Sequence, residues 1–298
     1  MLRVDKIGEF GLIGKIKQWA KTDASVVKGI GDDCAVIKYS KNKFMLFACD
    51  AIIEDIDFKK SDNPYLVGRK AIAVNISDIA AMGGEPKYAL VSLSLPKNKN
   101  LEYVKQLYRG INYWAKKFKI NVVGGDISHA QKIYIDISMI GFAAKKSVIL
   151  RSGAKEKDII LVSGRLGGSI RAKHLNFTPR LEEAKYLVNN FKINSMIDIS
   201  DGLLQDLGHI LKESKKGAVL YDDLIPLSKD SRSLNEALAM GEDFELLFTM
   251  PFAEVSRLIQ KRKDFKAIGY ITAQKTGLVL KDKQGNIKRI ALKGYRHF

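Results

Sequence analysis

The sequence predicts a folded protein of two domains that mix helices and strands. The chain has 298 residues, which suits two domains at about 150 residues each, and its 46% hydrophobic content is enough for packed cores. Short apolar runs of strand length alternate with longer segments of helical spacing. A basic turn at 144–153 separates the two halves, so we expect domains at 1–145 and 146–298.

In the first half, each expected element follows from its apolar pattern and its flanking residues. Lys43–Asp50 is short and apolar, as a buried strand is. Asn63–Pro64 suits the start of a helix, and Gly83–Gly84 suits its end. On this helix Asn75 and Asp78 stand three apart and share a face. The other expected elements are strands at Tyr88–Leu95, Ile120–Val123 and Ile133–Phe142 and a helix at Leu101–Phe118.

In the second half, the most informative segment is DISDGLLQDLGHIL, which starts at Asp198. Asp198 and Asp201 have the spacing of a helix N-cap and the first turn of that helix. The other expected elements are strands at Ile159–Ser163 and Glu245–Met250, a glycine-rich turn at Gly164–Ser169 and a helix at Arg180–Asn190.

The chain is strongly basic, with a net charge of +17 from 50 Lys and Arg residues against 33 Asp and Glu residues. Such a charge suits nucleic acid, an anionic membrane surface or small polyanionic substrates. The basic residues are spread along polar faces and turns without interleaved aromatic residues, which favours a solvated surface. No run of ~18 apolar residues occurs, and the first ten residues lack the apolar region of a signal peptide. We therefore expect neither a nucleic-acid partner nor a membrane span.

The two cysteines, Cys34 and Cys49, both lie inside motifs that contain aspartates. A disulfide framework is therefore not expected, and free thiols suit a reducing compartment. We expect a cytoplasmic protein.

Seven aspartates stand beside small or hydroxyl residues at places that look like turns or strand ends. Taken singly, each is explained as a turn, a helix cap or an exposed carboxylate. Together they indicate a shared site, because carboxylates that follow apolar runs are partly desolvated and would repel one another unless hard cations neutralised them. The pattern predicts bound Mg²⁺ and a site that handles phosphate groups. The seven are Asp32, Asp33, Asp50, Asp78, Asp126, Asp198 and Asp201.

The common nucleotide-binding fingerprints are missing from the sequence. Gly8–Ile16 (GEFGLIGKI) has glycines at the wrong spacing for a P-loop, and no Ser or Thr follows Lys15. The turn at Gly164–Ser169 does not fit the dinucleotide pattern, and the protein-kinase motifs HRD and DFG do not occur. If the chain uses ATP, it does so in another architecture.

A set of motifs in a fixed order resembles the thiamine-monophosphate kinase family. The motifs are GIGDDCAV, FACD, NISDIAAMGG, VVGGDISHA, RSGAK, DISDGL, GEDFEL and the terminal GYRHF. This family belongs to the superfamily of aminoimidazole ribonucleotide synthetase. The resemblance implies an α+β fold of two domains, in which the N-terminal domain forms a β-barrel with that of a second copy and the active site lies between the domains. It also implies a homodimer that uses ATP and Mg²⁺ to phosphorylate thiamine monophosphate to thiamine diphosphate.

The resemblance also assigns site residues, motif by motif. ATP contacts fall on Gly125, Asp126, Arg151 and Ser200. Contacts to thiamine monophosphate fall on Asp57, Glu242 and Tyr295. Asp32 is left with a turn or supporting role. The metal positions are Asp33, Cys49, Asp50, Asp78, Asp126, Asp198 and Asp201.

Three places depart from the pattern of the family. Ala48–Asp50 reads ACD where the family has Ser or Thr followed by Thr and Asp, so Cys49 replaces a hydroxyl residue at the metal site. Asp57 stands where the family has a histidine at the substrate, and Ile127–His129 differs from the usual GGDTTR. An acid near an anionic phosphate is unfavourable unless a metal or a lysine compensates for it. Two alternatives therefore stay open: a related enzyme with another small-molecule acceptor, or a basic nucleic-acid-binding protein on this fold that has lost catalysis.

The implied reaction requires no general base. The attacking oxygen of a phosphate monoester is already an anion near neutral pH, so none of the four histidines is needed to deprotonate it. The obstacle is repulsion between two polyanions, which divalent cations and positively charged side chains reduce.

Overall fold

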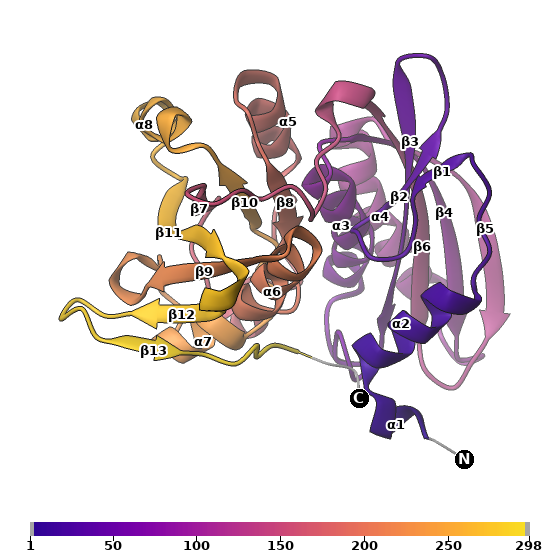
Figure 1. Ribbon diagram of the computed structural model, residues 1–298. Coiled ribbons are helices and arrows are strands. Elements are labelled where there is room, and N and C mark those ends of the chain that lie inside the picture. Colours follow the sequence, from indigo (N-terminus) through magenta and orange to yellow (C-terminus); the bar gives the residue numbers. More distant parts are fainter. Residues whose placement is uncertain (1–2, 296–298) are drawn as a thin grey trace.

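The computed structural model describes residues 3–295, which form two β-sheets, one from each half of the chain (Figure 1). The predicted two-domain α+β class is confirmed. None of the helices between residues 3 and 295 combines the length and the apolar character needed to cross a membrane. The elements of the first half are α1 (Val4–Ile7), α2 (Glu9–Trp19), β1 (Val26–Lys28), β2 (Ala35–Lys38), β3 (Lys43–Ile53), α3 (Pro64–Ala81), β4 (Glu85–Leu95), α4 (Leu101–Phe118), β5 (Asn121–His129) and β6 (Tyr134–Ala144).

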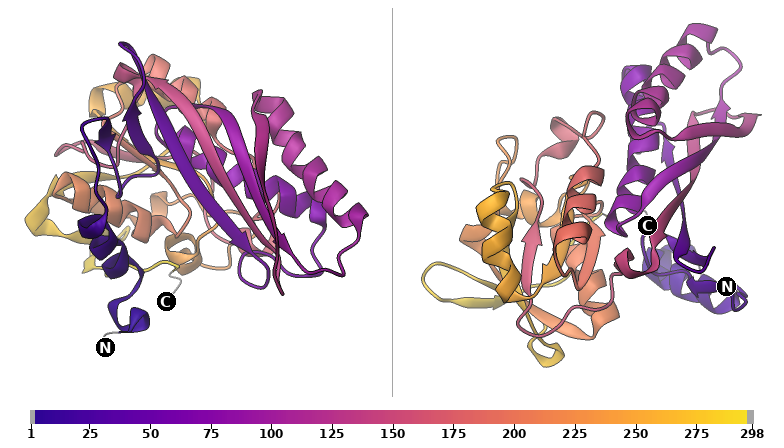
Figure 2. Two further views of the ribbon diagram at one scale, coloured as in Figure 1. Left: turned by 90° about the vertical axis from the view of Figure 1, so that its right-hand side faces the viewer. Right: turned by 90° about the horizontal axis from the view of Figure 1, so that it is seen from above.

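The first sheet has the strand order β1-β2-β3-β6-β4-β5, with β5 parallel to β4 at the outer edge. Helices α3 and α4 cover one face, where the alternation of β6 buries Ile135, Ile137 and Met139. The opposite face is open and carries exposed side chains such as Phe47 and Leu90; it faces the viewer in the left panel of Figure 2.

The second sheet has the strand order β13-β12-β9-β11-β7-β10-β8 and is antiparallel apart from the pair β9 and β12. Helix α6 packs against β8, β9 and β10 over a separate core cluster. The elements of this half are η1 (Lys145–Ser147), β7 (Ile159–Val162), η2 (Ser169–Arg171), α5 (Leu181–Asn190), β8 (Ser195–Asp198), α6 (Leu203–Ser214), β9 (Lys216–Tyr221), η3 (Asp222–Leu224), α7 (Leu234–Ala239), β10 (Leu246–Met250), α8 (Phe252–Lys261), β11 (Lys266–Ala273), η4 (Gln274–Thr276), β12 (Leu278–Lys281) and β13 (Ile287–Arg289).

Helix α3 joins the two halves and is buried along most of its length. It begins as predicted, because the side chain of Asn63 accepts a hydrogen bond from Tyr65 N at 2.9 Å. On one side it packs against β3, β4 and β6, and on the other it contacts α5 and β8. Gly68 allows α4 to approach closely, since a Cβ atom there would lie 2.0 Å from Leu107 O. Residues of α3 therefore reach the boundary between the halves.

Three local predictions were wrong. Asp50 does not end its strand, because β3 runs on to Ile53. Asp126 is not in a turn, because pairing with β4 continues β5 through the glycines before it. Asp198 is not the N-cap of α6: it is the last residue of β8, and Gly202 occupies the N-cap position.

Candidate active site

A cavity of about 1250 Å³ lies between the two halves and is lined by residues of both. It gathers every site residue that the sequence predicted, apart from Gly125 and Asp126. The predicted residues that line it are Asp33, Cys49, Asp50, Asp57, Asp78, Arg151, Asp198, Ser200, Asp201, Glu242 and Tyr295. The last three residues of the GYRHF motif, 296–298, lie outside the described part of the chain.

Three aspartates from distant parts of the chain lie together at one end of this cavity, which we call the metal end because it is the candidate metal site. Asp33 precedes β2, Asp78 lies in the last turn of α3, and Asp198 ends β8. One carboxylate oxygen from each lies within 4.8 Å of the others. The packing of α3 against β8 brings them together, and Ser77 Oγ donates a hydrogen bond of 2.5 Å to Asp198 Oδ2. Three carboxylate oxygens this close together can share one divalent cation, so the group is a candidate metal site.

Burial of the acidic side chains at this end raises the pKa values of three of them, Asp50, Asp78 and Asp198. Burial, followed by the nearby Asp33 charge, raises the pKa of Asp198 to about 8. Burial raises the pKa of Asp50 to about 6, although a hydrogen bond with Asp78 opposes this. The pKa of Asp78 is raised by burial and by the charges of Asp50 and Asp198. Burial therefore disfavours ionisation of all three carboxyl groups, and a bound cation would favour their ionised forms.

Asp50 and Cys49 point to opposite faces of β3, as neighbours in a strand do. The main-chain N–H of Asp50 donates to Asn75 Oδ1 at 3.2 Å, on the α3 side of the sheet. Cys49 lies on the open side, with its Sγ 3.4 Å from both carboxylate oxygens of Asp136. Burial raises the pKa of the Cys49 thiol, so the thiol stays protonated and is a weak ligand for a hard cation.

Arg151 is the cation that contacts the aspartates directly. Its Nη2 lies 2.8 Å from Asp33 Oδ1, and its main-chain N–H donates to Asp32 Oδ1 at 3.0 Å. Lys28 Nζ lies 3.4 Å from Asp32 Oδ2. Asp32 thus supports Arg151 rather than facing the cavity. Among the described residues, the buried Arg151 Nε has no hydrogen-bond partner, and the residue lines the cavity.

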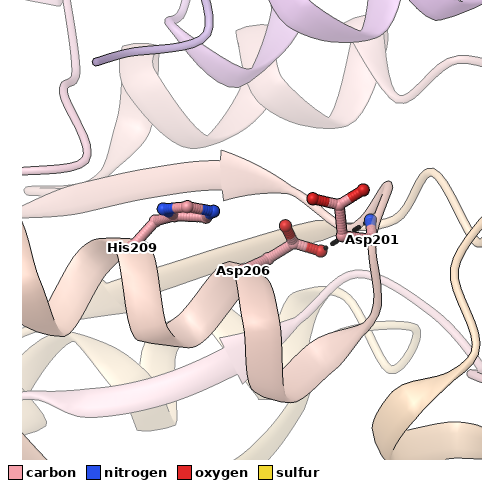
Figure 3. A group of neighbouring side chains, drawn as sticks. All are labelled: Asp201, Asp206 and His209. Atoms are coloured by element: carbon pink, nitrogen blue, oxygen red, sulfur yellow. Dashed lines mark hydrogen bonds between the residues drawn. The ribbon is translucent and has the colours of Figure 1, made fainter. Parts of the chain in front are cut away.

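Asp201 is held by Asp206, which the sequence reasoning missed. Asp206 Oδ2 accepts a hydrogen bond from the main-chain N–H of Asp201 at 3.1 Å (Figure 3) and a second from that of Gly202 at 3.0 Å. His209 lies one turn further along α6, and burial lowers its pKa to about 4. One oxygen or nitrogen of each of these three titratable side chains lies within 4.8 Å of the others. The signal in the sequence was an aspartate four residues after the N-cap glycine, within reach of unpaired N–H groups.

The other end of the cavity contains Asp57, Glu242 and Tyr295 around a lysine that the sequence reasoning also missed. Lys70 Nζ lies 2.5 Å from Glu242 Oε2 and donates to the main-chain oxygen of Asp57 at 2.9 Å. Tyr295 N donates to the main-chain oxygen of Asp201 at 2.9 Å, which fixes the C-terminal segment at the cavity. The signal for Lys70 was a charge inside an apolar helix, four and eight residues before two cavity positions, Val74 and Asp78.

Gly125 and Asp126 do not line the cavity of their own chain. Asp126 is exposed on the outer strand β5 and accepts a hydrogen bond from Ser128 Oγ at 2.8 Å. The register aligns Asp126 with Ser92, Ser92 with Asp136, and Asp136 with Ala51 of β3. Three strand spacings, about 14 Å, therefore separate Asp126 from β3.

Two family descriptions match the chain, with an overlap at 122–143. Residues 31–143 match "AIR synthase related protein, N-terminal domain", and residues 122–281 match "AIR synthase related protein, C-terminal domain". The fold and the carboxylate-lined cavity therefore define a protein of the AIR synthase related class.

Full-length relatives narrow this class. The chain is 37% identical to the thiamine-monophosphate kinase of Buchnera aphidicola subsp. Acyrthosiphon pisum, over 98% of this chain and 99% of the relative. It is 32% identical to the thiamine-monophosphate kinase of Aquifex aeolicus over the whole of both chains. A solved structure described as "AaThiL complexed with AMPPCP and TMP" has a TM-score of 0.88 at 33% identity and covers 100% of this chain and 99% of its own. The chain belongs to the thiamine-monophosphate kinase family.

Proposed function

We propose that this protein transfers the γ-phosphoryl group of ATP to the phosphate of thiamine monophosphate, giving thiamine diphosphate and ADP. The cavity carries the proposal, because it joins a group of buried, mutually repelling carboxylates to a pocket with an aromatic ring and a glutamate. Full-length relatives are named thiamine-monophosphate kinase. The similar solved structure is described as a complex with AMPPCP and TMP, which supports the same pair of substrates here.

The residues of the metal end fit Mg²⁺. Their donors are carboxylate oxygens, which Mg²⁺ prefers, and Asp33 Oδ2 is buried without a hydrogen-bond partner in the described part of the chain. We assign Mg²⁺ binding to Asp33, Asp50, Asp78, Asp198 and Asp201. Cys49 fits this set least well, because its thiol is protonated. Bound Mg²⁺ would offset the negative charge of the phosphates.

The chain's own residues bind and orient the two polyanions. Arg151 lines the cavity and binds a phosphate oxygen of ATP there, while Asp33 holds its guanidinium and Asp32 holds its main-chain N–H. Ser200 lies in the same wall between two metal-site aspartates and offers a hydroxyl donor. Tyr295 presents an aromatic ring to the acceptor, and such a face attracts a cationic thiazolium. No side chain has to remove a proton from the attacking phosphate.

We further propose that the protein is a homodimer in which the open faces of the first sheets form a shared barrel. The open face carries exposed apolar side chains such as Phe47 and Leu90, whose burial against a second copy would be favourable. Asp126, exposed at the edge of this sheet and outside its own cavity, would then serve ATP and Mg²⁺ in the cavity of the other subunit. We also propose that the chain divides into domains at 1–145 and 146–298 and that the protein is cytoplasmic.

Subunit complementation tests the role of Asp126. Asp126→Asn and Asp78→Asn should each abolish turnover while leaving the fold intact. If Asp126 acts across the dimer, re-assembled mixtures of the two variants contain heterodimers with one intact site, and about a quarter of wild-type turnover returns. Mixtures that stay inactive despite proven heterodimers would place the action of Asp126 within its own subunit. Near wild-type turnover of Asp126→Asn at saturating Mg²⁺ would remove it from the site.

The acceptor is tested by a coupled assay with ATP, Mg²⁺ and thiamine monophosphate, with the product identified by mass. Formation of thiamine diphosphate in step with ADP is the expected result. Formation of ADP without thiamine diphosphate would favour a different acceptor. The sequence feature that best supports a different acceptor is Asp57, which stands in place of a histidine. Binding to DNA or RNA with steep salt dependence and without ATP turnover would favour the non-catalytic alternative.

A further inference from the structure

Lys70 is a buried lysine whose ammonium group meets both halves of the molecule. The residue is 1% exposed in the middle of α3. Its Nζ lies 2.5 Å from Glu242 Oε2 in the second half and 2.9 Å from the main-chain oxygen of Asp57 in the first half. Burying an ammonium group is costly unless it is paired, so these contacts explain why the lysine is tolerated there.

Glu242 depends on its surroundings for its position. Its backbone has a φ of 70°, in the left-handed region that non-glycine residues rarely adopt, and Phe244 follows with a φ of 48°. Such a backbone persists when neighbouring groups hold it. Lys70 is one of these groups, since its ammonium faces the Glu242 carboxylate directly.

Both the side chain and the main-chain oxygen of Asp57 are used in hydrogen bonds that hold the loop after β3. Its Oδ2 accepts a hydrogen bond from Ile53 N at 2.7 Å, and its main-chain oxygen accepts one from Lys70. The side chain that replaces the histidine of the family therefore closes the turn after β3. The loop presents Lys70 with a carbonyl oxygen, and the lysine supplies the positive charge that an acid at this place requires.

Lys70 also connects the two ends of the cavity. Lys70, Val74 and Asp78 are spaced four residues apart on α3, and all three line the cavity. At 1.5 Å per residue, Lys70 lies about 12 Å along the helix from Asp78. Helix α3 thus places Lys70 and Asp78 about two turns apart along one wall of the cavity.

We propose that Lys70 is a positioning residue for the acceptor. By holding the Glu242 carboxylate and the Asp57 loop, it fixes the polar end of the cavity that receives the ring portion of thiamine monophosphate. The Glu242 carboxylate, so held, accepts a hydrogen bond from an amino group on a heteroaromatic ring. Lys70 acts through Glu242 and sets the affinity for the acceptor, while the ATP and metal end is unaffected. This inference rests on the proposed function.

The test is a double-variant cycle in the full-length enzyme: wild type, Lys70→Met, Glu242→Gln and the double variant. KM for thiamine monophosphate should rise roughly tenfold or more in Lys70→Met, with KM for ATP changed by less than about twofold. In the Glu242→Gln background, removal of Lys70 should change KM for the acceptor by no more than about twofold, because residues that act as a unit are not additive. Lys185→Met is the matched control: it breaks the exposed pair of Lys185 and Glu85, 2.6 Å apart, which also joins the two halves.

The double variant keeps the test decisive if Lys70→Met alone does not fold. It leaves no unpaired charge, so a comparison of Glu242→Gln with the double variant suffices: equal KM values for the acceptor support the inference. A wild-type KM in Lys70→Met, or fold-changes that multiply in the double variant, would overturn it. So would an equal rise in KM for ATP. If the wild-type enzyme makes no thiamine diphosphate, the proposed function fails; normal wild-type turnover with multiplying effects overturns the Lys70 inference alone.

Discussion

The cavity aspartates and Glu245 are both buried acidic groups, but their charges are balanced in different ways. Glu245 is 1% exposed and receives two hydrogen bonds of 2.7 Å from Arg180, one of 2.9 Å from Lys173 and one of 2.8 Å from Ser163 Oγ. Burial alone would raise the pKa of Glu245, but Arg180 and Lys173 outweigh it and the pKa is lowered. Glu245 is an anion that the protein itself has paired.

At the metal end the balance is reversed. Asp33 is paired with Arg151, but Asp50, Asp78 and Asp198 have raised pKa values because burial and mutual repulsion dominate. The direction of the pKa shift therefore distinguishes Glu245, a structural carboxylate, from the carboxylates of the candidate metal site. A carboxylate that is paired with its own cations needs no further ligand, whereas a buried group of carboxylates without enough cations favours the binding of a divalent cation. Removing a charge should therefore have opposite effects in the two places.

Asp78→Asn should give the largest change in activity. We expect kcat to fall by roughly 1000-fold or more, which corresponds to about 4 kcal/mol in the activation barrier, because one metal position is lost. Without Mg²⁺ the variant should be at least as stable as the wild type, because burial raises the pKa of Asp78 and an asparagine there is neutral without taking up a proton. The coupled assay and urea unfolding measure the two effects. Asp223→Asn, at an exposed position, is the control and should change neither. A large loss of metal-free stability in Asp78→Asn would make this aspartate structural, like Glu245.

Glu245→Ala should give the largest change in stability. It leaves Arg180 and Lys173 without their shared anion, and we expect a loss of about 3 kcal/mol in the free energy of unfolding. The folded fraction should retain turnover at low temperature. Glu156→Ala is the control: Glu156 pairs with Lys216 at 3.1 Å on the surface, and its loss should cost no more than about 1 kcal/mol. Equal losses in the two variants would remove the distinction between the buried and the exposed pair.

Sequence reasoning reached the elements and residues whose signals are local or belong to a motif. The helix at Leu101–Phe118 has the predicted bounds, and Asn63 caps α3, because capping and apolar spacing act over a few residues. The turn expected at Asp126 was wrong because pairing with a distant strand decided the conformation of its glycines.

The missing residues of the site depend on contacts between distant segments. Lys70 meets Glu242 only after the two halves have packed together, and Arg180 meets Glu245, 65 residues further along, only after the second half has folded. No spacing along the chain predicts which lysine will be buried against which glutamate. Asp206 is a different case, since its partners lie four and five residues away and a search for carboxylates near a helix start could have found it.

The pH dependence of stability should differ between the two regions. Because the folded pKa of Asp198 is about 8, above the value of ~3.9 for an unfolded chain, folding takes up a proton between these limits. Metal-free stability should therefore fall as the pH rises from about 4 to about 8, at up to about 1.4 kcal/mol per pH unit. Glu245 acts in the opposite direction. Its pKa is lowered on folding, so its ionised form contributes stability above about pH 4.5, and this contribution is lost as the pH falls below that value.

Mg²⁺ should cancel the first of these trends. Thermal unfolding at pH 6 and pH 8, with and without Mg²⁺, measures this, and stabilisation at 100 times Kd amounts to about 2.7 kcal/mol. The gain should be larger at pH 8, where the metal displaces fewer protons. A gain that is the same at both pH values, or present in Asp78→Asn, would show that the metal binds elsewhere.

The smallest effect is expected at Asp206, where two substitutions distinguish the role of its hydrogen bonds from the role of its charge. Asp206 holds the turn that carries Asp201 by accepting two main-chain hydrogen bonds, and an amide oxygen can accept the same two. Asp206→Asn should therefore keep the Mg²⁺ requirement close to that of the wild type. Asp206→Ala should cost about 1 kcal/mol in stability and raise the Mg²⁺ concentration needed for half-maximal turnover, because the turn is no longer fixed. If Asn proves as damaging as Ala, the charge of Asp206 matters, and Asp206 would join the carboxylates that hold the metal instead of those that position them.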